Sequence, residues 1–365
     1  PNIIMGINQN RFSIAGLWTR KTPASILKKQ QITFLFISLL FFTTSVLGSN
    51  FPEAKISNGI IKVRIYLPDS NTGYYRSTRF DWSGAIYSLQ YKKHEFYGKW
   101  FDRIDPKVIN WEHQGNEIVS GPCSALYGPV DEFQTVLGWN ESKPGESFIK
   151  IGVGVLRRGN GTYDRYQPYE ILNPGIWTVR KGKDFIEFSQ ELSDPGSGYA
   201  YIYRKVVRLV KDKPEMIIEH SLKNTGKQVI KSSVYNHNFV VLDKQSPGPD
   251  FTFRVPYEIS AGRPSDKVLA EPRGNEVVYL KKLSGKDEVS VQLQGFSNKV
   301  EDTEIIIENK MVGAGMKITG DRPLIRSFLW SVRTVLAVEP YISIDIAPGA
   351  EFSWKNMYEY YTTTK

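Results

Sequence analysis

The sequence predicts an all-β protein, a large antiparallel β-sandwich. Short alternating runs rich in Val, Ile, Tyr and Phe recur from Ile56 onward, and Gly, Pro, Asn and Asp interrupt them. The runs follow one another at roughly 8–15 residues, a spacing typical of strands joined by turns. Beyond residue 48, no window longer than about ten residues has the period of a helix. These observations favour a sandwich or barrel over any helical architecture.

The expected strands occur along the whole chain after residue 48. The clearest runs are residues 60–67, 148–155, 199–210, 215–222, 277–280, 289–293, 304–308 and 341–346. Turn-forming residues separate several of them, at Gly159-Asn160-Gly161, Asn224-Thr225-Gly226 and Ala347-Pro348-Gly349. Neither a fixed-period repeat nor a linker rich in Pro, Ser and Gly divides the chain. We therefore predict one β-sandwich domain over residues 49–365.

Residues 1–48 have the pattern of a lead and signal peptide. A basic stretch without acidic residues precedes an apolar run that starts at Ile32, and small residues follow up to Gly48. The apolar run is shorter than the roughly 20 residues of a spanning helix. We expect cleavage near Gly48, a secreted or periplasmic protein and no stable membrane insertion afterwards. An uncleaved anchor is the alternative, and Met5 is an alternative start because the lead is long.

The charge and the cysteine content exclude several classes of function. The first 48 residues hold 5 of the 47 Lys and Arg and none of the 38 Asp and Glu, so the remainder has an excess of only four positive charges. Nucleic-acid binding needs a concentrated basic footprint, and we expect no nucleic-acid partner. Cys123 is the one cysteine, which excludes an intrachain disulfide and a Cys/His zinc site.

One histidine stands out as a candidate for proton transfer. His237 ends a strand-like run and lies between Asn236 and Asn238, whose amides can hold an imidazole in one tautomer and bind sugar hydroxyls. His220 instead falls on the apolar side of an alternating run, the pattern of a core histidine. His94 and His113 lie in polar, loop-like sequence.

Two acidic segments could supply a partner carboxylate. Glu339 follows an apolar run and precedes Pro340, so we expect it where a strand gives way to a turn. An exposed carboxylate at a strand end is the alternative for this residue. Asp131 and Glu132 are adjacent, and because neighbouring residues of a strand face opposite ways, only one of them would enter a pocket. We favour Glu132.

The order of these motifs is similar to that of the galactose mutarotase-like superfamily, which includes the aldose 1-epimerases. The matching segments are Phe80 to Ile86, Asn224-Thr225-Gly226, Asn236-His237-Asn238-Phe239, Val338-Glu339-Pro340, Pro348-Gly349-Ala350-Glu351 and Tyr358 to Tyr361. The resemblance spans residues 75–361 and implies the supersandwich fold of that superfamily.

Three departures set this chain apart from typical epimerases. Tyr127 or its neighbours replace the first active-site histidine of the family. The usual Asn-Arg pair is not obvious, although Arg76 and Arg79 are candidates for its arginine. The segment between Glu339 and Pro348 is also shorter. The acid and the base match the family, whereas the residues that select the sugar do not.

The resemblance implies an acid–base mechanism without a metal or a cofactor. Glu339 would take the proton of the anomeric hydroxyl while His237, as an imidazolium, gives one to the ring oxygen. Ordinary pKa values would put both groups in the right state near neutral pH. The expected substrate-binding residues are Arg79, Tyr127, Glu132, Asn236 and Trp330, with Trp82 and Trp139 as alternative stacking platforms. Arg79 would anchor a hydroxyl or, on an acidic sugar, a carboxylate.

We expect a monomeric protein that binds a mono- or oligosaccharide. The sequence leaves two functions open besides that of an epimerase. The adjacent acids Asp131 and Glu132 are compatible with an oligosaccharide lyase or hydrolase, since glycoside cleavage commonly uses two carboxylates. A carbohydrate-binding protein without catalysis is the other alternative, because a fold does not fix a function.

Overall fold

A computed structural model describes residues 51–260 and 267–363, which belong to the unit Ser49–Lys365. The predicted signal peptide at residues 1–48 lies outside the described residues, so its cleavage stays a prediction. Within the described ranges, no helix is both long enough and apolar enough to cross a membrane.

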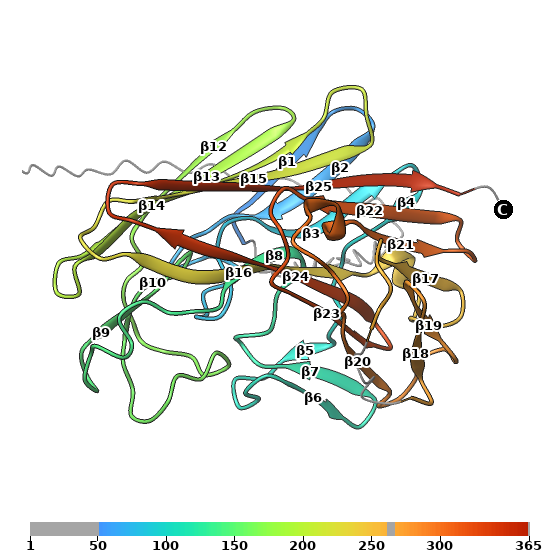
Figure 1. The fold of residues 1–365 in the computed structure, drawn as a ribbon, viewed down its shortest axis with the longest axis horizontal. Coiled ribbons are helices and arrows are strands. Elements are labelled where there is room, and N and C mark those ends of the chain that lie inside the picture. The colour runs from blue at the N-terminus through green and yellow to red at the C-terminus, as the bar shows by residue number, and fades with distance from the viewer. Residues whose placement is uncertain (1–50, 261–266, 364–365) are drawn as a thin grey trace, which may run out of the picture. The chain divides into compact units, whose positions relative to one another are not determined.

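Two large antiparallel sheets form the sandwich (Figure 1). The ten-stranded sheet has the order β12 (Ile176–Lys181), β13 (Phe185–Asp194), β14 (Tyr199–Leu209), β15 (Glu215–Asn224), β25 (Glu351–Thr362), β22 (Ala314–Gly320), β21 (Ile305–Asn309), β17 (Phe251–Arg254), β19 (Glu276–Tyr279) and β18 (Ala270–Arg273). The five-stranded sheet has the order β20 (Glu288–Gln292), β23 (Arg326–Val332), β24 (Val335–Ile346), β16 (Ile230–Val240) and β8 (Gly128–Phe133). The predicted all-β sandwich is confirmed.

Three small sheets and two short helices complete the described fold. One sheet is β1 (Glu53–Ser57), β2 (Ile61–Tyr66), β3 (Ala85–Tyr91) and β4 (His94–Glu95). A second is β11 (Ile171–Asn173), β10 (Gly154–Arg157) and β9 (Ser147–Lys150), and a third is β5 (Arg103–Ile104), β7 (Glu117–Ser120) and β6 (Trp111–Gln114). The 3₁₀ helices are η1 (Leu242–Lys244) and η2 (Val300–Thr303).

The alternation of the sequence sets which face of each strand is buried. In β15 the side chains of Met216, Ile218, His220 and Leu222 are buried, and those between them are more exposed. Successive side chains of a strand point to opposite faces, so this row faces the core. His220 is therefore a core residue, as predicted.

The predicted strand over residues 148–155 is wrong, because glycines divide it. The chain forms β9 and β10 as a hairpin, with Gly152 at φ 79° in the turn. A β-carbon at Gly152 would lie 2.9 Å from Cβ of Asp81. A glycine is needed there both for the left-handed backbone and for the close approach.

The chain changes from one large sheet to the other at two corners that meet at Asn224. β15 and β25 belong to the ten-stranded sheet, and β16 and β24 to the five-stranded sheet. The buried side chain of Asn224 donates from Nδ2 to the carbonyls of Gln228 (2.8 Å) and Ile346 (2.9 Å). Its backbone carbonyl accepts from the amide of Gly349 at 2.9 Å. One residue thus ties the corner before β16 to the corner after β24.

A buried charged layer lies between the two large sheets. Asp131 of β8 contacts Lys205 of β14 at 2.7 Å and Nε2 of His220 at 2.9 Å. Lys205 also lies 3.5 Å from Asp81, and all these side chains are nearly inaccessible to solvent. Burial opposes ionisation of Asp131, but the charge of Lys205 and the hydrogen bonds from His220 and Asn236 outweigh it and hold the pKa of this carboxyl well below its usual range.

We predict that Asp131→Asn costs about 3 kcal/mol or more of unfolding free energy, because it leaves the buried charge of Lys205 without its nearest partner. Urea unfolding followed by tryptophan fluorescence measures this change. Asp345→Asn is the matched control, since Asp345 pairs across strands with Lys231 at 3.6 Å on the exposed surface. That control should cost less than about 1 kcal/mol. Equal costs for the two variants would contradict a stabilising role for the buried layer.

Candidate active site

The register of β16 against β24 places His237 opposite Glu339. Tyr235 pairs with Tyr341 and Asn238 with Val338, and this register sets His237 beside Glu339 on neighbouring strands. Nε2 of His237 lies 3.2 Å from Oε1 of Glu339. The sequence prediction that Glu339 ends a strand is wrong, since Glu339 and Pro340 lie inside β24. Pro340 has no amide hydrogen, which accounts for the gap in the ladder beside it.

Neighbouring residues of β16 serve opposite faces of the five-stranded sheet. Asn236 points away from His237 into the buried charged layer, where its Nδ2 donates to Oδ1 of Asp131 at 3.0 Å. The hydroxyl of Tyr358 in β25 lies within hydrogen-bonding distance of Oδ1 of Asn236 (2.6 Å) and of Oδ1 of Asn238 (2.9 Å), and its one proton is donated between these two acceptors. Asn236 therefore does not line the pocket of His237. The expected sugar contact of Asn236 is not formed, because adjacent side chains of a strand point to opposite faces.

His237 and Glu339 lie in an open pocket with about 610 Å³ of empty space, its mouth included. The pocket is lined by Arg79, Trp100, Asn110, Trp111, Ser124, Tyr166, His237, Phe239, Glu288, Ser290, Phe328, Trp330 and Glu339. Six of these thirteen residues are aromatic, and the other seven are polar or charged. A concave site that combines aromatic rings with convergent polar groups is typical of small-molecule binding.

Aromatic rings hold the imidazole of His237 in place. The ring of Phe239 stacks on it with centroids 3.7 Å apart, and Phe80 meets it edge-on at 5.8 Å. Within the described residues, Nδ1 of His237 has no hydrogen-bond partner. Burial holds the pKa of His237 well below its usual value, and the positive charge of Arg79 lowers it further.

Burial shifts the pKa of the partner carboxyl in the opposite direction. The pKa of Glu339 is raised because its charged form is desolvated. The hydroxyl of Tyr341 donates to Oε2 of Glu339 at 2.6 Å and opposes part of this shift. From the sequence, ordinary pKa values are expected for both groups. The structure differs because the pair is almost fully enclosed, an environment that favours the neutral forms of both groups.

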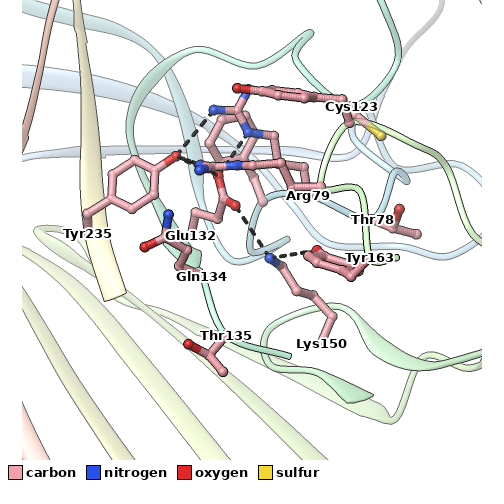
Figure 2. Close-up of polar contacts among 12 residues, drawn as sticks. Thr78, Arg79, Cys123, Glu132, Gln134, Thr135, Lys150, Tyr163 and Tyr235 are labelled. Atoms are coloured by element: carbon pink, nitrogen blue, oxygen red, sulfur yellow. Dashed lines mark hydrogen bonds and ion pairs between the residues drawn. The ribbon is translucent and has the colours of Figure 1, made fainter. Parts of the chain in front are cut away.

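Beside the pocket, three cationic side chains surround one buried carboxylate (Figure 2). Within the described residues, Glu132 contacts Nε of Arg79 at 2.8 Å, Nζ of Lys150 at 3.5 Å and the guanidinium of Arg165. We call these four residues the cationic cluster. Burial lowers the pKa of Lys150 to about 8, although Glu132 raises it. Burial also opposes ionisation of Glu132, but Arg165, Lys150 and Arg79 hold the pKa of this carboxyl well below its usual range.

The other sequence-predicted residues are divided between the pocket and the core. Arg79 and Trp330 line the pocket, and Nε1 of Trp330 donates to Glu288 at 2.9 Å. Glu132 lies outside the lining and instead orients Arg79. Tyr127 is buried against Tyr74 and Phe101 and does not reach the pocket. Two further candidates, Trp82 and Trp139, also lie outside it.

Sequence reasoning missed several residues that shape the site. They are Lys150, Arg165, Tyr166, Tyr235, Glu288, Trp111 and Tyr341. The alternation of β16 and β24 could have indicated Tyr235 and Tyr341, which lie two residues from His237 and Glu339 on the same faces. Lys150 and Arg165 belong to distant segments, and no local pattern brings them to Glu132. In the described part of the chain, no group of three or more His, Cys, Asp and Glu is placed to hold a metal ion.

We predict that the imidazole of His237 stays neutral at pH 6.5, where an ordinary histidine is half protonated. The imidazole should gain its proton only as the pH falls further. Two-dimensional NMR of the ring protons measures the titration, and the spectrum of His237→Asn assigns the signal. A midpoint at or above pH 6.5 would contradict the effect of burial described for this ring.

Comparison with known proteins bears on the fold. No family profile and no curated protein sequence matches the chain. The Slr1438 protein of Synechocystis sp. PCC 6803 is similar in structure, with 12% identity and a TM-score of 0.51 over 86% of this chain and 96% of that one. A putative aldose 1-epimerase from Escherichia coli K12 has 11% identity and a TM-score of 0.48 over 86% and 100% of the two chains.

A galactose mutarotase related enzyme from Lactobacillus acidophilus has 14% identity and a TM-score of 0.46, over 86% of this chain and 98% of that one. At these identities the likeness concerns the fold, and activity has to be argued from the site. Two of these structures are named as a putative aldose 1-epimerase and a galactose mutarotase related enzyme, the group that the order of motifs in the sequence resembles. This chain shares its all-β sandwich fold with the Slr1438 protein.

Proposed function

We propose that the protein interconverts the anomers of a sugar, an aldose 1-epimerase type of reaction. The observation that carries the proposal is the pair His237–Glu339, whose Nε2 and Oε1 atoms lie 3.2 Å apart in a pocket with aromatic walls. Anomer exchange requires one proton to leave the anomeric hydroxyl and another to reach the ring oxygen. A proton acceptor and a proton donor that lie side by side can carry out these two transfers.

The step uses a pair that holds one transferable proton. The unprotonated member takes the proton of the anomeric hydroxyl, while the protonated member gives its proton to the ring oxygen. The bond between C1 and the ring oxygen breaks, and the C1 carbonyl of the open chain forms. After rotation about the C1–C2 bond, closure on the other face of the carbonyl returns both protons.

The shifted pKa values decide where the transferable proton lies in the free protein. The resemblance to epimerases assigns the acid to His237 as an imidazolium. A lowered pKa of His237 and a raised pKa of Glu339 instead favour the neutral pair, with the proton on Glu339. Both arrangements hold the same number of protons. The reaction can start from either, because the acid and the base exchange roles during it.

The walls of the pocket suit a pyranose. Trp111 and Trp330 line it with Phe328, and flat rings of this kind pack against the apolar face of a sugar. Arg79, Asn110 and Ser124 add hydrogen-bonding groups on the same lining. We further infer export of the protein from residues 1–48, in keeping with an extracellular or periplasmic sugar.

A hydrolase of oligosaccharides is the second candidate. The carboxylates that support it in the structure are not Asp131 and Glu132, which the sequence suggested. Asp131 lies in the buried charged layer and Glu132 in the cationic cluster, so neither lines the pocket. Glu288 does line it together with Glu339. Two carboxylates in one pocket are compatible with glycoside cleavage.

We predict that Glu339→Gln and His237→Asn each lower anomer exchange by about 10²-fold or more, since each removes one of the two proton-transfer groups. Exchange spectroscopy by NMR on a panel of aldoses measures the rate against the uncatalysed one. Glu351→Gln is the matched control, because Glu351 is exposed at the start of β25 and should leave the rate unchanged.

Three outcomes separate the candidate functions in that experiment. Full activity of Glu339→Gln would exclude the pair as the catalytic groups. New reducing ends released from oligosaccharides, without anomer exchange, would identify the hydrolase. Sugar binding by calorimetry without any turnover would identify a binding protein.

We predict a bell-shaped dependence of kcat/KM on pH, because the active pair holds one proton. The acid limb should lie below the ordinary histidine value of 6.5, where a second proton adds to His237. The basic limb should lie above the ordinary glutamate value of 4.5, where Glu339 loses its proton. Tyr341→Phe removes a hydrogen bond that lowers the pKa of Glu339 and should move the basic limb to higher pH. A limb that stays in place or moves to lower pH would contradict the assignment.

A further inference from the structure

We propose that the pocket is built for a uronic acid, a sugar whose carboxylate on C5 is bound by Arg79. The inference rests on the proposed epimerase function and specifies its substrate class. Two independent features of the cationic cluster lead to it, namely the fixed plane of the Arg79 guanidinium and the imbalance of buried charge around Glu132.

The guanidinium of Arg79 is held in one plane at the wall of the pocket. It lies over the ring of Phe80 at 4.3 Å and over the ring of Tyr166 at 4.8 Å. Three of its N–H groups donate to Glu132 (2.8 Å), to Oγ of Ser124 (2.9 Å) and to the hydroxyl of Tyr235 (3.2 Å). A guanidinium has five N–H groups, so two remain without a partner among the described residues. A planar donor fixed in this way matches a carboxylate better than a single hydroxyl.

The buried charges beside the pocket do not balance. Arg79, Arg165 and Lys150 contact Glu132, and their side chains are between 0% and 21% exposed. Three positive groups around one carboxylate leave an excess of positive charge in a poorly solvated region. An unbalanced buried charge is costly, and an anionic ligand group at Arg79 would offset that cost.

The position of Arg79 relative to the catalytic pair fits a charge on C5. Arg79 and His237 line the same pocket, and both contact the ring of Phe80. In the proposed reaction one member of the pair meets the ring oxygen, which is bonded to C5. A carboxylate on C5 therefore lies close to the group that exchanges a proton with the ring oxygen.

The acidic residue Glu288 lines the pocket from β20, and β23 separates it from Glu339 of β24. The carboxylate of Glu288 accepts a hydrogen bond from Trp330.

Comparison of three kinds of sugar tests the substrate class with the wild-type protein. Anomer exchange is measured by NMR for D-glucuronate and D-galacturonate, for D-glucose and D-galactose, and for the 6-phosphates of the same hexoses. We expect kcat/KM about 10- to 100-fold higher for a uronate than for its neutral hexose. Equal values for uronate and hexose overturn the inference and leave the epimerase function standing. A preference for the 6-phosphates overturns the carboxylate assignment.

Absence of turnover on every sugar would refute the epimerase function, and calorimetry would then decide the inference by itself. Binding of a uronate at least about tenfold tighter than its neutral hexose upholds a pocket that binds an anionic sugar, and equal binding overturns the inference.

Substitutions at Arg79 test whether this side chain makes the distinction. Arg79→Met removes the charge, and Arg79→Lys keeps the charge but loses the planar fork. Both variants should lose the preference for the uronate, about tenfold or more, while activity on the neutral hexose falls less. Arg76→Met is the matched control, because Arg76 is exposed, donates to the carbonyl of Asn71 and lies outside the pocket. Thermal melting establishes that each variant is folded, and a preference retained in Arg79→Lys and Arg79→Met overturns the inference.

Discussion

The alignment of β16 with β24 is the constraint on which the candidate site depends. Those two strands are central in the five-stranded sheet, and each is preceded or followed by a corner that leads to the ten-stranded sheet. Asn224 hydrogen-bonds to both corners, at Gln228 and at Ile346. The register of β16 against β24 is constant between these corners and the pair His237–Glu339. The hydrogen bonds of Asn224, more than ten residues away, therefore help to keep His237 opposite Glu339.

In this alignment, the side chains of β16 face two different regions of the protein. His237 faces the pocket, while Asn236 and Asn238 face the ten-stranded sheet and bind Asp131 and Tyr358. The amides therefore contribute to the site by fixing the backbone on either side of the imidazole. Hydrogen bonds and ion pairs on the side that faces the ten-stranded sheet make a slip of one residue costly, because such a slip would turn the imidazole toward that sheet and the amides toward the pocket.

Much of the fold and the choice of His237 and Glu339 as a candidate pair could be predicted from the sequence, since both depend on local patterns. Strand alternation and turn residues predicted the sandwich, and the order of motifs singled out His237 and Glu339. The substrate contacts were harder. Asn236 was assigned to the pocket because its side chain suits a sugar, yet alternation sends it to the opposite face. Tyr127 was inferred from its place in the motif order and proved to be packed among other rings.

The remainder depends on contacts between distant segments, which no single-sequence pattern encodes. Lys150 and Arg165 reach Glu132 from separate parts of the chain, and their approach produces the imbalance of charge beside the pocket. The pKa values also differ from the sequence expectation, because burial depends on the packing of Phe80 and Phe239 around His237.

The pair and one part of the pocket wall have different structural origins. His237 and Glu339 belong to central strands that are paired on both sides, whereas Trp111 comes from a small three-stranded sheet, and Arg79, Asn110, Ser124 and Tyr166 come from segments between strands. Connecting segments accept insertions and replacements far more readily than paired strands do. For the proposed reaction, exchange of these loops would change the sugar that is bound, while the paired strands keep the two proton-transfer groups in place.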